Sequence, residues 1–164
     1  HFTAGGDPVK LAAKELDLSV FLADSPIRQI FAVRNGDSAC NILASLENGM
    51  SASVECGTRL PAGTEAMDRH EIIARRGVAS DRVVDTQVPQ SSIYTWTDSG
   101  LRTYTDVDTE LFGLTNEQVW VVRAAFAVLM KPALAEEWNH AAAAVRKYAT
   151  AIVASDADNK PVIF

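Results

Sequence analysis

The stretch that decides the fold is residues 38–56, which read SACNILASLENGMSASVEC. Two runs of residues typical of strands, 38–47 and 50–56, stand on either side of Asn48-Gly49. Asn-Gly between two such runs is the strongest short signal for a β-hairpin closed by a two-residue turn. The sequence therefore predicts an antiparallel pair of strands over residues 38–56.

A two-residue turn also fixes which side chains share a face, because side chains alternate along each strand. It sets Leu43 opposite Val54 on one face, which is predicted to be core. The other face would carry six residues, apolar on one strand and polar on the other: Ile42, Ala44, Leu46, Ser51, Ser53 and Glu55. In this register Cys40 and Cys56 point to opposite faces, so we expect no disulfide between them.

Outward from the hairpin, the chain shows further elements on both sides. Asp7-Pro8 is a typical helix start and predicts a helix that runs to about Ala23. Residues 60–67 are predicted to be a loop. Strands are predicted over residues 27–34, 69–76, 79–87, 93–97 and 101–106, with a last short strand over residues 161–164.

The last third of the chain is predicted to be helical. Thr115 and Gln118 have the spacing of a capping box before a helix that reaches Lys131-Pro132. A second helix is predicted over residues 133–155. Strands clustered between helices indicate an α+β fold, which we expect to be one open, predominantly antiparallel sheet with helices on one face. Residues 1–164 are predicted to form a single domain.

Composition excludes several classes of protein. The chain has 164 residues, of which 48% are apolar and 22% charged, with a net charge of -6. This balance is typical of a globular domain, and the acidic charge argues against nucleic acid and against an anionic membrane surface. Two cysteines and no apolar run near the ~20 residues of a membrane span favour a cytoplasmic protein.

Several segments, in order, resemble the C-terminal domain of the Gfo/Idh/MocA oxidoreductases, a family named for glucose–fructose oxidoreductase and inositol dehydrogenase. Residues 5–18, GGDPVKLAAKELDL, are similar to the family pattern G-G-x-x-x-D-x-x-x-H-x-x-D-L. Residues 38–52 resemble its hairpin, and residues 70–78, HEIIARRGV, its strand–glycine–strand segment. Residues 151–164 look like the family's ending.

The resemblance implies a parent protein that oxidises a sugar, a polyol or a similar hydroxy compound with NAD or NADP. It also implies an exposed sheet face that packs against another subunit, and hence a homo-oligomer. The nine glycines never form G-x-G-x-x-G, and the family's Glu-Lys-Pro segment is absent. The chain also starts at His1 rather than Met. We therefore expect the cofactor-binding Rossmann half to lie outside this chain, and the chain alone to bind no cofactor and to be inactive.

The residues on the first helix depart from the family. In active members an Asp and a His of this helix face the substrate, and the His acts as acid/base. Here Lys10 stands at the Asp position and Lys14 at the His position, while Asp17 keeps the third position. Lys14 and Lys10 are therefore the candidate catalytic residues and Asp17 a candidate substrate-binding residue.

Two alternatives remain for this helix. In the first, the lysines are solvated surface residues, and Asp17 pairs with Lys14. In the second, a substrate carboxylate or phosphate lies between the two lysines. The alternative for the parent protein is accordingly a non-catalytic sensor or assembly protein that lost the Asp/His pair.

We predict no metal site from the remaining acidic and histidine motifs. His70-Glu71 begins like a zinc-protease helix, but no second His follows and the segment is typical of a strand. Asp106, Asp108 and Glu110 alternate and could gather carboxylates along an extended strand, but a calcium loop needs more ligands and a glycine. These three residues are predicted to form a solvated edge.

Other polar residues are assigned structural roles. His140 follows Trp138 on the last predicted helix, where a core or surface histidine is the usual case. Arg75 and Arg76, adjacent on a predicted strand, would point to opposite faces and make separate salt bridges rather than bind one anion.

Overall fold

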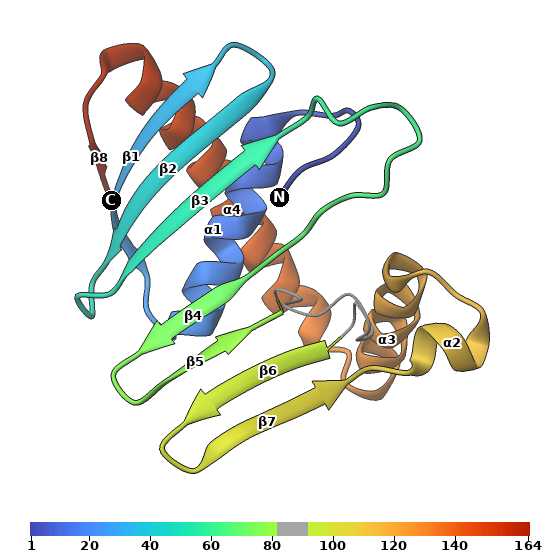
Figure 1. Cartoon of the computed structure of the whole chain (residues 1–164). Helices are drawn as coiled ribbons and strands as arrows, with labels where there is room; N and C mark the ends of the chain where they lie inside the picture. Colours follow the sequence, from blue (N-terminus) through green and yellow to red (C-terminus); the bar gives the residue numbers. More distant parts are fainter. Residues whose placement is uncertain (82–91) are drawn as a thin grey trace. The chain divides into compact units, whose positions relative to one another are not determined.

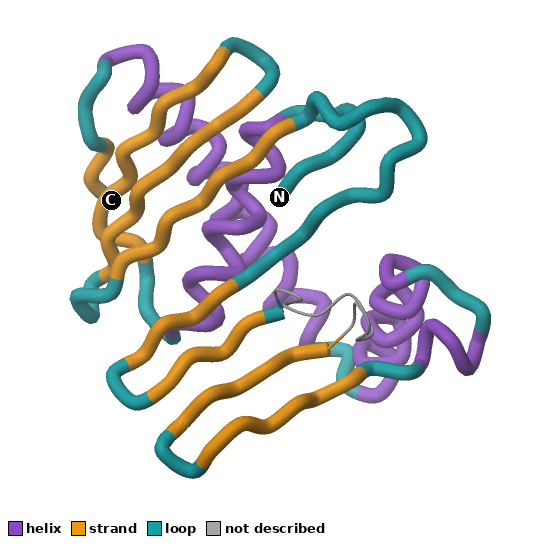
Figure 2. The backbone as a smooth tube through the Cα atoms, in the orientation of Figure 1, coloured by secondary structure: helices purple, strands orange, loops and turns teal. Residues whose placement is uncertain are grey.

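A computed structural model of the chain describes residues 1–81 and 92–164. Its contacts gather into two compact units: His1–Asp68 with Ala135–Phe164, called unit 1, and Arg69–Leu134, called unit 2. Figure 1 labels the helices and strands of both units, and Figure 2 distinguishes helix, strand and loop along the backbone.

Unit 1 is built on a four-stranded antiparallel sheet. Its strands are β1 (Ile27–Asn35), β2 (Ala39–Leu46), β3 (Ser51–Gly57) and β8 (Val162–Ile163). Their order across the sheet is β3-β2-β1-β8, and each pair of neighbours is antiparallel. The hairpin predicted over residues 38–56 is the β2–β3 pair.

Two helices cover one face of this sheet, as Figure 1 shows for α1 (Pro8–Ala23) and α4 (Leu134–Asp158). Their apolar sides and the inward side chains of the strands form one core. Its fully buried members include Ala12, Leu16, Ile30, Cys40, Cys56 and Ile152. The predicted α+β class, with helices on one face of an open antiparallel sheet, is confirmed for this unit.

Local sequence explains where α1 starts. The Asp7 carboxylate accepts a hydrogen bond of 2.9 Å from the Val9 N–H, which would otherwise lack a helical partner. Pro8 follows at the first helical position, where its missing N–H costs nothing. The predicted start and end of this helix are both confirmed.

The short strand β8 leaves part of the β1 edge without a strand partner, since it pairs only with Gln29 and Ile30. Side chains of α4 accept hydrogen bonds from backbone N–H groups of β1 that lie beyond β8. The Ala32 N–H donates to Ser155 Oγ at 2.9 Å, and the Arg34 N–H donates to Asp156 Oδ1 at 2.8 Å. The buried Ser155 hydroxyl also donates to the Lys160 carbonyl at 2.7 Å, so the end of α4 is fastened to the sheet.

The register of the β2–β3 hairpin differs by one residue from the predicted register. Leu43 pairs with Ser53, and Ile42 pairs with Val54. The Leu46 N–H donates to the Met50 carbonyl at 2.9 Å and Gly49 has a positive φ of 85°, so the loop holds three residues instead of two. Asn48-Gly49 thus marks the turn correctly, but the added loop residue shifts every pair.

This shift reverses the predicted faces of β2, whereas Val54 of β3 is buried as predicted. Ile42, Ala44 and Leu46 are buried against the helices, whereas Leu43 is 62% exposed. Cys40 and Cys56 are direct cross-strand partners on the buried face, and both are free thiols. The prediction that they point to opposite faces was wrong, because it depended on the two-residue turn. Burial raises the pKa of the Cys40 thiol to about 11 and that of Cys56 to about 12.

Unit 2 holds a second four-stranded antiparallel sheet in the order β4-β5-β6-β7. The strands are β4 (Glu71–Ala74), β5 (Gly77–Ser80), β6 (Ser92–Thr97) and β7 (Gly100–Thr105). The predicted hairpin around residues 98–100 is confirmed. The prediction of a single sheet holds only loosely, since among the described residues the strands form two ladders, with residues 58–70 between β3 and β4.

The strand predicted over residues 69–76 is the shorter β4, and only the beginning of the strand predicted over residues 79–87 falls in β5. β4 ends at Ala74, so Arg75 and Arg76 form the turn into β5 rather than part of a strand. Residues 82–91, which include most of the second predicted strand, lie outside the described part of the chain. A Cβ on Gly77 would overlap the Trp96 carbonyl oxygen, so only glycine lets β5 pair closely with β6 here.

Unit 2 also contains the helices α2 (Asp108–Phe112) and α3 (Asn116–Met130). The predicted capping box of α3 is confirmed: the Gln118 N–H donates to Thr115 Oγ1, and the Thr115 N–H donates to Gln118 Oε1. The predicted strand over residues 101–106 is confirmed as β7, but Asp106, Asp108 and Glu110 do not share an extended strand, because α2 begins at Asp108. Asp106 Oδ1 accepts the Asp108 N–H at 3.0 Å and so turns the chain.

No helix in the described part of the chain combines the length and the apolar character that a membrane crossing requires.

Candidate functional site

The candidate site predicted from the sequence lies on α1. Lys10, Lys14 and Asp17 follow one another at four and three residues, so they share one side of the helix. Both lysines are exposed, whereas Asp17 is half-buried. The opposite side of α1 holds the helix in place, since Ala12, Ala13 and Leu16 are fully buried in the core of unit 1. The three polar side chains therefore stand on a rigid support.

Asp17 occupies a different electrostatic environment from the two lysines. Burial raises the pKa of its carboxyl group. The nearby Tyr148 of α4 is 8% exposed, and its pKa is raised by burial and then by the negative charge of Asp17. Tyr148 also packs edge-on against the Phe164 ring, with centroids 5.6 Å apart. The Tyr148 phenol is thus a buried group of α4 on which the charge of Asp17 acts.

Among the described residues, no ion pair joins Asp17 to Lys14, so the pairing considered in one alternative is not found. The half-buried Asp17 holds its proton more tightly than an exposed aspartate does. In chemical terms the row offers two ammonium groups for an anionic or hydroxylated ligand and one carboxyl group that can donate or accept a hydrogen bond.

Tyr148 was not singled out from the sequence, because its spacing on the last helix is that of a core position. The core position is correct. A polar phenol in an otherwise apolar stripe is the signal that could have singled it out, since buried tyrosines usually find a polar partner.

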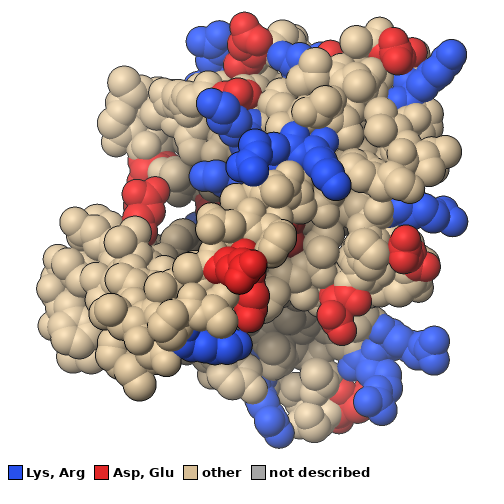
Figure 3. All heavy atoms as spheres, turned by 180° about the vertical axis from the view of Figure 1, so that it is seen from behind, with Lys and Arg blue, Asp and Glu red and all other residues tan. Residues whose placement is uncertain are grey.

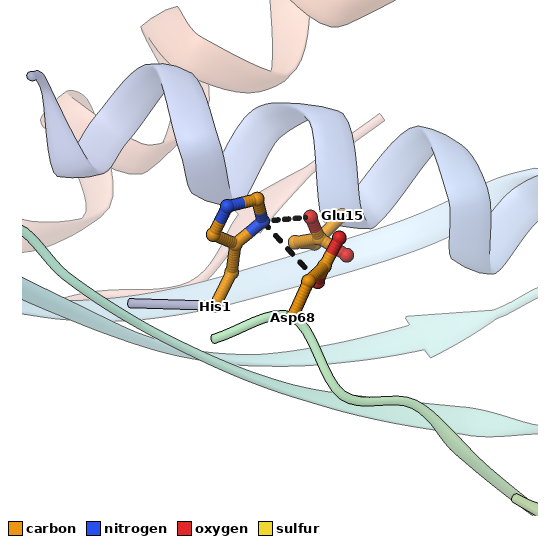
Figure 4. A group of neighbouring side chains, drawn as sticks. All are labelled: His1, Glu15 and Asp68. Atoms are coloured by element: carbon orange, nitrogen blue, oxygen red, sulfur yellow. Dashed lines mark hydrogen bonds and ion pairs between the residues drawn. The ribbon is translucent and has the colours of Figure 1, made fainter. Parts of the chain in front are cut away.

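A second group of polar side chains in unit 1 was not predicted. His1 Nδ1 lies 2.9 Å from Glu15 Oε1 and 3.3 Å from Asp68 Oδ1, as Figure 4 shows. One ligand atom from each residue lies within 4.8 Å of the others, which makes this a group that could hold a metal ion. Its three members are far apart in sequence, so no motif marks them.

The other polar residues considered from the sequence have partners or are exposed. His70 lies just before β4, not on a helix, and its Nδ1 is 2.7 Å from Asp81 Oδ2. Asp106 and Asp108 both bind the Arg123 guanidinium, and these ion pairs lie at exposed positions, so the predicted solvated site of these carboxylates holds although they are paired with an arginine.

Two further residues, His140 and Glu110, are exposed on α4 and α2. Arg75 and Arg76 border an open groove of about 410 Å³, lined also by β4, β5 and two threonines of β6. Figure 3 shows acidic and basic side chains interspersed over the face that it draws.

Comparison with known proteins gives matches in structure. No protein-family model matches the chain, and no curated protein does. An oxidoreductase domain protein from Kribbella flavida matches 93% of this chain and 48% of its own, with a TM-score of 0.66 and 16% identity. A levoglucosan dehydrogenase in complex with NADH and levoglucosan matches the same shares with a TM-score of 0.65 and 16% identity.

An NAD-binding protein from Listeria innocua matches 100% of this chain and 57% of its own, with a TM-score of 0.53 and 15% identity. At these identities the likeness is one of fold. The chain spans about half the length of the solved structures that it matches. Its fold is thus one found in oxidoreductases, which agrees with the resemblance to the Gfo/Idh/MocA C-terminal domain.

Proposed function

We propose that this chain is the C-terminal, substrate-side domain of an NAD(P)-dependent oxidoreductase of the Gfo/Idh/MocA family, acting on a sugar, polyol or similar hydroxy compound. The observation that carries the proposal is the match of 93% of the chain to a dehydrogenase solved with NADH and levoglucosan. The half-length coverage of that structure supports a parent protein with a separate cofactor-binding half. In this proposal the isolated chain is inactive and the parent works in the cytoplasm.

The roles of the α1 residues follow from the chemistry of alcohol oxidation. The hydroxyl group loses a proton to a protein base, and the same carbon loses a hydride to the nicotinamide. Lys14 is the proposed acid/base, with Lys10 beside it on the same side of α1 and Asp17 hydrogen-bonding a substrate hydroxyl. A lysine acts as a base only when part of it is uncharged, which a neighbouring cation and burial by the substrate and the cofactor half would favour.

A second candidate function is that of a non-catalytic sensor or assembly protein. The exposure of Lys10 and Lys14 favours it, because exposed ammonium groups are accessible to an anion from solvent. Two ammonium groups one helical turn apart suit a carboxylate or phosphate ligand better than a neutral sugar.

Homo-oligomerisation through the outer face of the unit 1 sheet is part of the proposal. Val33, Leu43 and Ile163 are 48%, 62% and 74% exposed on that face. A face with several large apolar side chains suits contact with another protein surface.

Light scattering tests this interface. It should show an oligomer for the chain and a smaller species for Leu43→Asp; a monomer in both cases would count against this interface.

The catalytic proposal is tested on the full-length protein. Oxidation of a panel of polyols and sugars is measured with NAD and with NADP. We expect activity that falls at least ~100-fold in Lys14→Ala, as general acid–base groups contribute about 10²–10⁴-fold. Lys147→Ala, a change of another exposed lysine on α4, is the matched control and should be neutral.

The two functions predict different outcomes in this experiment. Activity that is unchanged in Lys14→Ala would remove Lys14 from the mechanism. No activity with any substrate, combined with binding of carboxylates that is lost in Lys14→Ala, would favour the sensor.

A further inference from the structure

Backbone pairing in unit 1 holds His1 and Asp68 face to face. Phe2 and Met67 form an antiparallel bridge, with hydrogen bonds of 2.8 and 2.9 Å between their N–H and carbonyl groups. The next pair in such an arrangement is His1 with Asp68, so their side chains lie on one face. The Gly57 N–H donates to the His1 carbonyl at 3.0 Å, which fastens this segment to the end of β3.

Glu15 reaches the same place from α1. Its neighbour Leu16 and the preceding turn at Ala12 are fully buried, which fixes the rotation of the helix about its axis. Glu15 Oε1 lies 2.9 Å from His1 Nδ1, and its side chain is only 14% exposed. Figure 4 shows the imidazole and both carboxylates converging from three separate segments.

From this geometry we propose that His1, Glu15 and Asp68 form a binding site for a divalent transition-metal cation of the Zn²⁺ type. Zinc binds His nitrogen and carboxylate oxygen at about 2.0–2.2 Å, so tetrahedral ligands lie roughly 3.4 Å apart. His1 Nδ1 is 2.9 and 3.3 Å from the two oxygens, and all three atoms lie within 4.8 Å. Shifts of about 1 Å or less would bring all three to these ligand distances.

The chemistry of the three ligand atoms, one imidazole nitrogen and two carboxylate oxygens, favours a bound cation over a shared proton. A single Nδ1–H points well at one oxygen, and its hydrogen bond to the second weakens as the angle closes. A cation between the three ligand atoms contacts all of them at once. One nitrogen and two oxygens are a mixed set that suits Zn²⁺ better than Mg²⁺, which prefers octahedral oxygen ligands and keeps several waters.

A bound cation would act as a cross-link. It would join three segments: the N-terminal segment, α1 and residues 58–70. Within residues 58–70 the β-type pairing that the structure describes is the isolated bridge at Met67, so a metal ion would add a second tie close to it. The site lies within unit 1 and does not involve the lysine row of α1, so it stands independently of the proposed oxidoreductase function.

The test is calorimetric titration of Zn²⁺ into the metal-free 164-residue chain. We expect one equivalent to bind and to raise the melting temperature. Glu15→Gln and Asp68→Asn should each weaken binding at least ~10-fold, because each removes a direct ligand. Asp81→Asn is the matched control: it removes the carboxylate beside His70, the other His–Asp pair, and should leave the affinity unchanged.

Two controls separate binding by these side chains from binding by the terminal amine and from loss of folding. A chain with one residue added before His1 carries a peptide nitrogen in place of the free amine, and it should bind Zn²⁺ equally well. Far-ultraviolet circular dichroism confirms that each variant is folded, and Glu15→Ala, which also removes the carboxylate and keeps a good helix former, replaces Glu15→Gln if the latter is not. The proposal is overturned by no Zn²⁺ binding at micromolar concentrations, by equal losses in Asp81→Asn, or by binding that disappears with the added residue.

Discussion

Units 1 and 2 differ in how they are held together. Every buried apolar side chain among the described residues belongs to unit 1, with the single exception of Val119 in α3. Unit 2 has well-formed ladders and a capped helix, but its large apolar side chains are mostly exposed. They include Leu101, Tyr104, Leu111, Phe112, Trp120, Val121, Phe126, Leu129 and Met130. Regular secondary structure is thus present in both units, whereas a core built from sequence-distant residues is a property of unit 1.

The comparison teaches which interactions stabilise each region. In unit 1, helices and sheet bury one another, and burial of a large apolar side chain contributes about 1.5–3 kcal/mol. In unit 2, backbone hydrogen bonds, the Thr115–Gln118 box and the Arg123 ion pairs dominate, and each contributes less in water. Exposed apolar area of this extent is typical of a surface that meets another protein surface.

The largest expected effect comes from the same substitution made in each unit. Leu16→Ala removes a fully buried side chain from unit 1 and should lower the free energy of unfolding by about 2–5 kcal/mol. Leu129 is 78% exposed in unit 2, so Leu129→Ala should change it by less than ~0.5 kcal/mol. Urea denaturation followed by circular dichroism measures both. Similar losses in the two variants would contradict the contrast in burial.

A smaller effect is expected where glycine is required by close packing. A Cβ at residue 77 would meet the backbone carbonyl of Trp96, so Gly77→Ala must separate β5 from β6 and should cost ~2–3 kcal/mol. At residue 57 the Cβ would lie 2.7 Å from the Phe2 ring, which can move aside, so Gly57→Ala should cost nearer ~1 kcal/mol. Trp fluorescence during denaturation reports the first variant. A larger loss in Gly57→Ala would reverse the predicted order.

The smallest effect concerns two aspartates whose pKa values shift in opposite directions. Burial acts to raise the pKa of Asp81 in unit 2, but hydrogen bonds from the side chain and backbone of His70 outweigh it, and the pKa is lowered. Its contribution to stability is therefore complete above the unfolded value of about 3.9 and is lost as the pH falls through the folded value. Asp81→Asn should lower the free energy of unfolding by less than ~1 kcal/mol at pH 7. It should also weaken the fall of that free energy as the pH is lowered.

Asp17 in unit 1 has the opposite sign, because burial raises its pKa. Asp17 holds its proton more tightly in the folded chain than in the unfolded chain. The free energy of unfolding therefore falls as the pH rises from the unfolded-state pKa toward the folded-state pKa. Asp17→Asn should accordingly raise stability slightly at pH 7. Denaturation midpoints between pH 3 and pH 7 test both variants, and parallel curves for the two would show that neither shift matters.

Features that depend on a few neighbouring residues were predicted well from the sequence. The Asp7 cap of α1, the capping box of α3 and the position of the β2–β3 turn are all confirmed. Their chemistry is short-range, since a side chain three residues away satisfies a donor that the helix leaves open. The common side of Lys10, Lys14 and Asp17 was likewise predictable, because helical periodicity places them there.

Features that depend on one extra residue or on distant partners were not predictable. The hairpin loop holds three residues, so the pairing shifts by one, and Cys40 meets Cys56 on the buried face. Residues 106–110 alternate like a strand, yet α2 forms there after the turn at Asp106. In the hairpin the buried face is decided by packing against the helices, whereas α2 buries no side chain and follows the local hydrogen bond between Asp106 and the Asp108 N–H.

By itself, the sequence determined the α+β class, most element positions, and the row of Lys10, Lys14 and Asp17 on one helix. Only the tertiary structure decided the hairpin register, the packing of Tyr148 against Phe164, and the convergence of His1, Glu15 and Asp68. The physical reason is range: caps and helical faces are decided within a few residues, whereas convergence requires that a core first bring distant segments together.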